Sequence, residues 1–303
     1  LVTRDKSLAK TPALAESWSQ TAPDTWRFKL RPNVKFHDGS PFTAEDVAFT
    51  IKRAQGATSQ FTSYSAGLTP KIVDDLTIDI VTPKPDPLLP DKIMNLPIMS
   101  KLWTEKNGAL EPQNLKEKKE SFTALNANGT GPYKLVSRAP DSKTVLARSP
   151  TYWGKLDGDI DEVVFMPIGS DPTRMAALVS GEIDIAIDVP SQDVARLSQN
   201  PDLKISKVDE FRTIFFGFDL KNDKLKYAET GDKNPFKDIR VRQAINMAVD
   251  RDAIVRTVMR GLASPTAQIL APGNVGYDPA LDKAPKVDRE GARERIAAVW
   301  RCA

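Results

Sequence analysis

The sequence predicts an α/β protein of about two domains. Its 303 residues suffice for two domains of ordinary size. Stretches with apolar residues at every second position, typical of strands, alternate with stretches at helical spacing. The clearest case begins with a continuous apolar run at 163–168, broken only by Pro167, which predicts a buried strand. A helix at 171–180 follows, with Asp171 at its cap and Gly181 at its end, then a strand at 183–187 and a helix after Ser191. Such a strand–helix–strand–helix order favours a sheet covered by helices.

The first part of the chain predicts a strand, a turn and a capped helix. Residues 26–30 alternate apolar and polar side chains, as a half-buried strand does. Asp38-Gly39 is a turn signal. Thr43 and Asp46 have the spacing of a capping box, with aspartate in place of the usual glutamate, so we expect a helix to begin after Thr43.

Residues 234–261 predict two capped helices. Asp238 and Asp250 precede apolar residues at helical spacing, where a side-chain oxygen can accept from free amides of the first turn. Gly261 follows the last apolar residue, where a left-handed cap is common. The expected buried faces consist of Val241, Ala244, Ile245 and Ala248, and of Ile254, Val255, Val258 and Met259.

Charge and cysteine content exclude several classes of protein. Lys plus Arg number 43 against 40 for Asp plus Glu, so the net charge of +3 argues against a nucleic-acid or membrane-surface partner. No apolar run reaches the length of a membrane span. The single cysteine, Cys302, excludes an intrachain disulfide and a thiolate-rich metal site. The chain opens on Leu1 without a signal peptide, which we interpret as a mature or trimmed start.

Catalytic and metal-binding patterns are weak. His37 is the single histidine and would have to serve any Ser–His–Asp or Cys–His arrangement, but no nucleophile motif lies near it, so we expect a structural or surface role. The alternating aspartates of 157–161 suggest a calcium loop, yet Glu162 and Ile168 occupy the places of its glycine and glutamate. We expect no catalytic residue, no metal and no cofactor.

Four motifs, taken in order, resemble one family. They read FKLRPNVKFHDGSPFTAEDV at 28–47, NGTGPYKL at 128–135, RMAALVSGEID at 174–184 and PFKDIRVRQAINMAVDR at 235–251. This wording resembles the family 5 solute-binding proteins of ABC importers, which carry oligopeptides, dipeptides and nickel complexes. The resemblance extends from Leu14 to about Gly291.

The resemblance implies a two-lobed, periplasmic-binding-protein-like fold of the type II class and no catalysis. A peptide or similar small polar solute would be captured between the lobes and delivered to the permease subunits. The protein would be periplasmic, or extracellular and tethered to the membrane. Residues 1–160 would form the small subdomain of the first lobe, 161–218 its α/β core, and 219–303 the beginning of the second lobe. A cleft hydrolase and a solute sensor are the alternatives.

Five residues are candidates for the ligand cleft by position alone: Met99, Asn128, Thr130, Tyr133 and Phe216. They stand in or beside irregular stretches, where apolar and polar groups can line a cleft. Gly129 and Gly131 suggest a turn that needs positive φ, which a valine adopts only at a cost. Ala44 is expected at the exposed start of a helix, so Gly131→Val is expected to cost more stability than Ala44→Val.

The end of the chain departs from the family wording. Family members are longer, and residues 294–303 do not continue the motif that precedes them. We therefore expect a truncated member with an incomplete second lobe. The helices at 239–259 would then expose apolar faces, with weak or absent ligand affinity and a tendency to self-associate.

Overall fold

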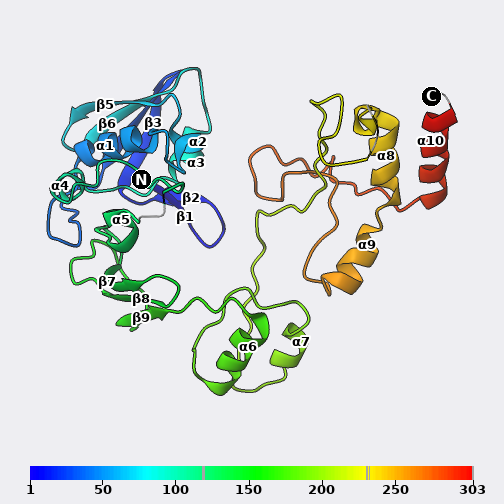
Figure 1. Cartoon of the computed structure of the whole chain (residues 1–303). Helices are drawn as coiled ribbons and strands as arrows, with labels where there is room; N and C mark the ends of the chain where they lie inside the picture. The colour runs from blue at the N-terminus through cyan, green and yellow to red at the C-terminus, as the bar shows by residue number, and fades with distance from the viewer. Residues whose placement is uncertain (118–119, 230, 232, 302–303) are drawn as a thin grey trace. The chain divides into compact units, whose positions relative to one another are not determined.

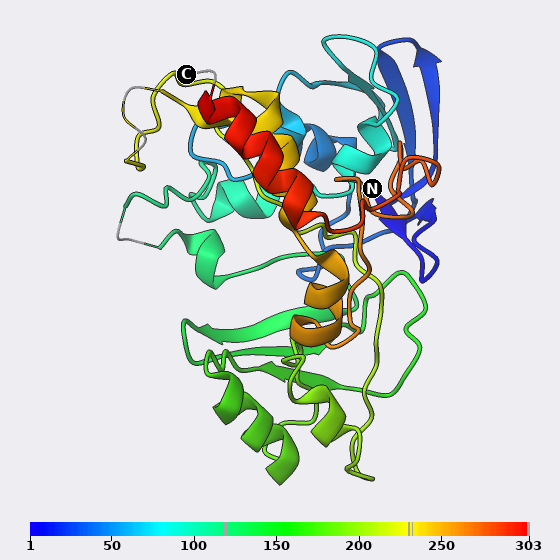
Figure 2. The same ribbon diagram turned by 90° about the vertical axis from the view of Figure 1, so that its right-hand side faces the viewer.

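A computed structural model describes residues 1–117, 120–229, 231 and 233–301, with the side chains of residues 300 and 301 left aside, so Cys302 lies outside the described residues. The chain forms two compact units, Leu1–Pro167 and Ile168–Ala303, which are treated separately below (Figures 1 and 2). The three-part division at residues 160 and 218 remains a prediction.

The first unit is built on a four-stranded antiparallel sheet, which contains β3 (Ala15–Ala22), β4 (Thr25–Leu30), β5 (Thr69–Asp74) and β6 (Thr77–Val81) in the order β3-β4-β6-β5. Phe28 of β4 pairs with Ile78 of β6, so their side chains lie on the same face of the sheet. Both side chains are buried. Helix α1 (Ala44–Ala54) adds Val47 and Ile51 to the same core (Figure 1). The predicted strand at 26–30 is confirmed.

The capping box of α1 forms as predicted. The Thr43 amide donates to the Asp46 carboxylate at 2.9 Å. The other Asp46 oxygen accepts from the Lys101 amide at 2.8 Å, which ties the start of α1 to the start of a later helix, α4 (Lys101–Lys106). Burial raises the pKa of the Asp46 carboxyl, although these hydrogen bonds oppose the shift. Ala44 is fully buried beside this cap, contrary to the expectation of an exposed position.

Smaller elements complete the first unit. Strands β1 (Val2–Arg4) and β2 (Lys10–Pro12) form a separate antiparallel pair. Three short helices follow α1 or precede the second sheet: α2 (Thr62–Ser65), α3 (Leu89–Ile93) and α5 (Phe122–Leu125). The second sheet has the antiparallel order β7 (Tyr133–Ala139), β8 (Lys143–Arg148) and β9 (Glu162–Phe165).

Strand β9 is exposed, although the sequence predicts a buried strand at 163–168. It pairs only with β8 among the described strands and lies at the edge of its sheet. The side chains of Val163, Val164 and Phe165 all remain accessible to solvent. Continuous apolar runs favour strands covered on both faces, and the described residues do not cover β9 in this way.

The second unit consists of short helices and irregular segments. Its elements are α6 (Asp171–Ser180), α7 (Val194–Leu197), η1 (Pro235–Lys237), α8 (Ile239–Ala248), α9 (Arg251–Ala253), the π-helical η2 (Ile254–Val258) and α10 (Arg289–Arg301). Helix α6 ends at Gly181 with φ of 76°, as predicted, but its N-cap is Ser170 rather than Asp171. Its buried residues are Met175 and Ala177, whereas Val179 is exposed.

The predicted strand at 183–187 does not form. Ile185 and Ile187 are 74% and 63% exposed. An extended segment becomes a strand only through hydrogen bonds to a neighbouring strand. Within the described chain these residues pair with no strand, so the strand–helix–strand unit is not completed.

The two predicted helix caps at Asp238 and Asp250 are confirmed. Asp238 accepts from the Arg240 amide, and Asp250 from the Ala253 amide, both at 2.8 Å. Gly261 takes the expected positive φ of 78°. Val241 and Ala244 are buried in α8, as predicted, although Ala248 is exposed.

The buried face predicted for the second helix is wrong. Ile254 and Val258 are exposed. This stretch is also not a regular α-helix, because three α-helical residues pass into the π-helical η2.

The end of the chain packs within the second unit. Helix α10 lies beside α8, and its Ala292 is buried. The Asp288 amide donates to the Met247 carbonyl at 2.9 Å, and Arg295 donates to the Gln243 side chain at 2.8 Å. Among the described residues, no helix is both long and apolar enough to cross a membrane.

Candidate functional site

Two turns that are distant in sequence form one hydrogen-bonded structure in the first unit. The His37 amide donates to the Gly129 carbonyl at 2.8 Å, and the Gly129 amide donates to His37 Nδ1 at 3.3 Å. His37 Nε2 lies 2.9 Å from the Gly131 carbonyl. The Asp38 amide donates to Asn128 Oδ1 at 3.1 Å. The turn of 128–131 is therefore fixed on the turn of 37–38.

These contacts select one form of the His37 ring. Nδ1 faces an N–H donor and must accept, whereas Nε2 faces a carbonyl oxygen and must donate. The neutral imidazole with its proton on Nε2 is the form that satisfies both partners. Both ring nitrogens are engaged with backbone, which agrees with the predicted structural role.

Asn128 interacts with both the backbone and the side chain of Asp38. The residue is buried, with 9% of its surface exposed. Its Oδ1 accepts from the Asp38 amide. No acceptor lies within ordinary hydrogen-bond distance of Nδ2 among the described residues, but the side chain is close enough to the Asp38 carboxylate to lower its pKa. Burial opposes ionisation of Asp38, but hydrogen bonds from Ser40 and an interaction with Asn128 hold the pKa of its carboxyl below the ordinary value.

Thr130 and Tyr133 continue the same turn into β7. Thr130 is half-buried. The Tyr133 hydroxyl donates to the Ile160 carbonyl at 2.8 Å, so it links β7 to the segment before β9. Gly131 does not have positive φ, and a Cβ added there would meet open space. The prediction that Gly131 needs a left-handed backbone is therefore wrong.

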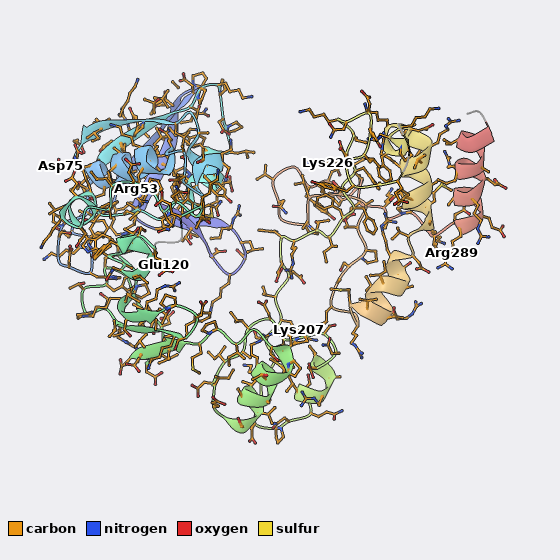
Figure 3. All side chains as sticks on the ribbon, in the orientation of Figure 1. Arg53, Asp75, Glu120, Lys207, Lys226 and Arg289 are labelled. Atoms are coloured by element: carbon orange, nitrogen blue, oxygen red, sulfur yellow. The ribbon has the colours of Figure 1, made fainter. Side chains whose placement is uncertain are left out.

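Met99 contacts residues of α1 instead of the turn at 128–131. Its amide donates to the Thr50 hydroxyl at 2.9 Å. The Arg53 guanidinium, labelled in Figure 3, lies 3.4 Å from the Met99 sulfur and donates to the carbonyls of Ala109 and Glu111 at 3.3 and 2.8 Å. Burial lowers the pKa of Arg53, and the nearby Glu111 charge partly offsets this.

Phe216 lies in the second unit and is 72% exposed. The structure therefore brings Asn128, Thr130 and Tyr133 together, whereas Met99 has other contacts within the first unit and Phe216 belongs to the second unit. Sequence reasoning missed His37 and Arg53 as neighbours of the candidates. Asp38-Gly39, next to the single histidine, predicted a turn. The residues that this turn contacts are about ninety positions away in the sequence, and no local pattern identifies them.

Comparison with known proteins identifies the class of protein. The profile of the family described as bacterial extracellular solute-binding proteins, family 5 middle, matches residues 10–300. The chain belongs to this family. The match includes most of the C-terminal segment whose wording departs from the family motif.

Curated relatives include two proteins of enteric bacteria. The chain is 28% identical over 271 residues to the periplasmic oligopeptide-binding protein OppA of Salmonella typhimurium, covering 82% of this chain and 46% of that protein. It is 28% identical over 290 residues to the dipeptide-binding protein of Escherichia coli, covering 88% and 51%. The chain thus spans about half the length of these relatives.

Solved structures show the same fold. A peptide-binding protein AppA from Clostridium difficile, described as putative in its structure, matches 98% of this chain and 59% of its own with a TM-score of 0.78 at 23% identity. DppA from Helicobacter pylori, solved with the peptide STSA, matches 99% and 59% with a TM-score of 0.74 at 25% identity. The chain therefore has the fold of two-lobed periplasmic binding proteins, over part of their length.

Proposed function

We propose that this chain is a solute-binding component of an ABC importer, which captures a peptide or a similar small polar solute and delivers it to the permease subunits. The family match over residues 10–300 carries the proposal. The relatives named for oligopeptide and dipeptide binding favour a peptide-like solute. The relative OppA, which is named as a periplasmic protein, supports a periplasmic location. An extracellular location with a membrane tether is the alternative that we propose.

The proposed solute contacts are Met99, Asn128, Thr130, Tyr133 and Phe216. Of these, Asn128, Thr130 and Tyr133 lie together, in the turn of 128–131 and at the start of β7. Main-chain hydrogen bonding to an extended peptide would tolerate many side chains. Closure of two lobes would then shift the open–closed equilibrium through contacts made only in the closed state.

A hydrolase is the less favoured alternative. His37 would have to act as the base, yet both of its ring nitrogens are engaged with backbone groups. Incubation of the chain with a mixture of short peptides, followed by saturation-transfer NMR and mass spectrometry, tests both functions. We expect saturation transfer to intact peptides and no cleavage. Products that disappear in His37→Ala would overturn the proposal.

The proteins that bind the chain distinguish a solute sensor from a transport component. We expect permease subunits of an ABC importer to be recovered with the chain after crosslinking.

Self-association is also proposed, and rests on exposed apolar residues such as Ile185 and Phe216. Light scattering over a concentration series tests it, and a constant monomer mass would contradict it.

A further inference from the structure

Glycine directly follows asparagine or aspartate at four places: Asp38-Gly39, Asn107-Gly108, Asn128-Gly129 and Asp157-Gly158. Glycine has no side chain to hinder its amide nitrogen. That nitrogen can attack the side-chain carbonyl carbon of the preceding residue and close a cyclic imide, a succinimide. Water then opens the ring to isoaspartate, in which the main chain passes through the side-chain carbon. The structure separates these places by what their reacting groups contact.

The Asn107-Gly108 dipeptide is held at the end of α4. The Gly108 amide donates to the Glu105 carbonyl at 3.1 Å. Asn107 Nδ2 donates to the Trp103 carbonyl at 2.7 Å, which directs the side chain back along the helix. The attacking nitrogen and the side chain that it would attack are both engaged. The helix end must therefore open before the ring can close.

The Asp38-Gly39 and Asn128-Gly129 dipeptides are fixed on each other. The Gly129 amide donates to His37 Nδ1 at 3.3 Å, and Asn128 Oδ1 accepts from the Asp38 amide at 3.1 Å. The Gly39 amide donates to the carbonyl three positions earlier at 2.9 Å. Both attacking nitrogens are therefore held by hydrogen bonds in the folded chain.

The Asp157-Gly158 dipeptide lacks these restraints. The Asp157 side chain is 93% exposed, and its ion pair with Lys155 spans 3.7 Å. Gly158 is exposed with φ of 112°, and a Cβ added to it would meet open space. Within the described residues its amide donates no hydrogen bond. The Gly158 nitrogen is therefore free to approach the Asp157 carboxyl carbon.

The loop is anchored only after this nitrogen. Arg148 donates from Nη2 to the Gly158 carbonyl at 3.0 Å and from Nε to the Ile160 carbonyl at 3.2 Å. The Tyr133 hydroxyl donates to the same Ile160 carbonyl. An isoaspartate at position 157 adds a main-chain carbon directly before this anchored part.

We propose that Asp157-Gly158 is a site of spontaneous isoaspartate formation in the folded chain, and that folding protects the other three dipeptides. The Gly158 nitrogen bonds to the carboxyl carbon of protonated Asp157, and the amide proton leaves with the carboxyl hydroxyl as water. Water then adds to the main-chain carbonyl of residue 157 and breaks its bond to the nitrogen. The isoaspartate formed has the composition of the original aspartate, and no oxidant or reductant is needed.

The test compares the folded chain with the chain unfolded in guanidinium chloride, both kept for several weeks near neutral pH at physiological temperature. Trypsin places the four dipeptides in separate peptides, with Asp157 in 156–174. Mass spectrometry with electron-transfer fragmentation identifies isoaspartate. In the unfolded chain Asn107 and Asn128 should react first, because an ionised carboxylate resists attack more than a neutral amide does.

Folding should reverse this order. Asn107 and Asn128 should react about tenfold or more slowly than in the unfolded chain, because their hydrogen bonds must first break. Asp157 should keep its unfolded rate and become the leading site of isoaspartate. If Asn107 and Asn128 also lead in the folded chain, the proposal is overturned.

The control variant is Asp157→Glu, which keeps the charge at an exposed position but requires a larger ring that closes more slowly. Its peptide 156–174 should remain free of isoaspartate after the same incubation. Isoaspartate that persists there would belong to another aspartate, such as Asp159, and would overturn the assignment. An isoaspartyl methyltransferase with labelled S-adenosylmethionine gives a second readout. It should label the incubated folded wild type above Asp157→Glu, and equal labelling would contradict the proposal.

Discussion

The two units differ in what their apolar residues contact. In the first unit, Phe28 and Ile78 meet across neighbouring strands, and α1 covers the core they belong to. In the second unit, Ile214 and Phe216 remain exposed in a segment without regular structure. Both units contain well-capped helices. The difference therefore lies in long-range pairing, which the first unit completes within itself and the second, within its described residues, does not.

The largest expected effect separates the two units directly. Phe28→Ala should destabilise the first unit by about 3–5 kcal/mol, because the ring is fully buried and its removal leaves a cavity. Phe216→Ala should change the free energy of unfolding by less than about 0.5 kcal/mol, as exposed substitutions do. Urea denaturation of both variants gives the comparison. A comparable loss for Phe216→Ala would show that its ring is buried in solution.

A second pair reverses an expectation from the sequence. Ala44 is fully buried beside the α1 cap, so Ala44→Val should cost about 1–3 kcal/mol through overpacking. Gly131 has open space for a Cβ and a backbone outside the left-handed region, so Gly131→Val should cost less. Thermal melts of the two variants decide the order. A larger loss at Gly131 would mean that its backbone differs from the one described.

The third prediction tests whether local caps matter in the second unit. Asp238→Ala removes the acceptor for the Arg240 amide and should destabilise α8 by about 1 kcal/mol. Asp238→Asn keeps an acceptor and should lose much less. Hydrogen exchange of the α8 amides reports this directly. Equal exchange in both variants would indicate that α10, rather than the cap, stabilises α8.

The sequence predicted what depends on nearby residues. The caps at Thr43, Asp238 and Asp250 and the helix end at Gly181 were found because each involves groups a few positions apart. The failures involve distant partners. The strand at 183–187 needed a neighbour that the described chain does not supply, and an apolar run could not show that β9 would be exposed.

The candidate site follows the same rule. Asn128, Thr130 and Tyr133 were chosen for their irregular stretch, and they do share one turn and the start of β7. The four bonds that fix this turn on His37 and Asp38 could not be predicted, because no spacing relates segments so far apart. Whether Met99 and Phe216 contact the solute stays a prediction.

The smallest expected effect is a pH dependence within the first unit. Arg27 and Asp79 face each other on β4 and β6 with two hydrogen bonds of 2.7 and 2.8 Å. The hydrogen bond from Arg27 lowers the pKa of Asp79 below its ordinary 3.8, and burial opposes this. The unfolded chain therefore binds a proton at a higher pH than the folded chain does. The resulting stabilisation is present above about pH 4 and lost as the pH falls through the folded-state pKa.

Asp79→Asn should lower stability at neutral pH, and the gap from wild type should close as the solution is acidified. Urea melts between about pH 7 and pH 3 measure this gap. The control is Asp157→Asn, because Lys155 and Asp157 are 3.7 Å apart with side chains 91% and 93% exposed. Exposed pairs contribute little, so its gap should be near zero at every pH. A gap for Asp79→Asn that is constant with pH would assign its effect to packing instead of charge.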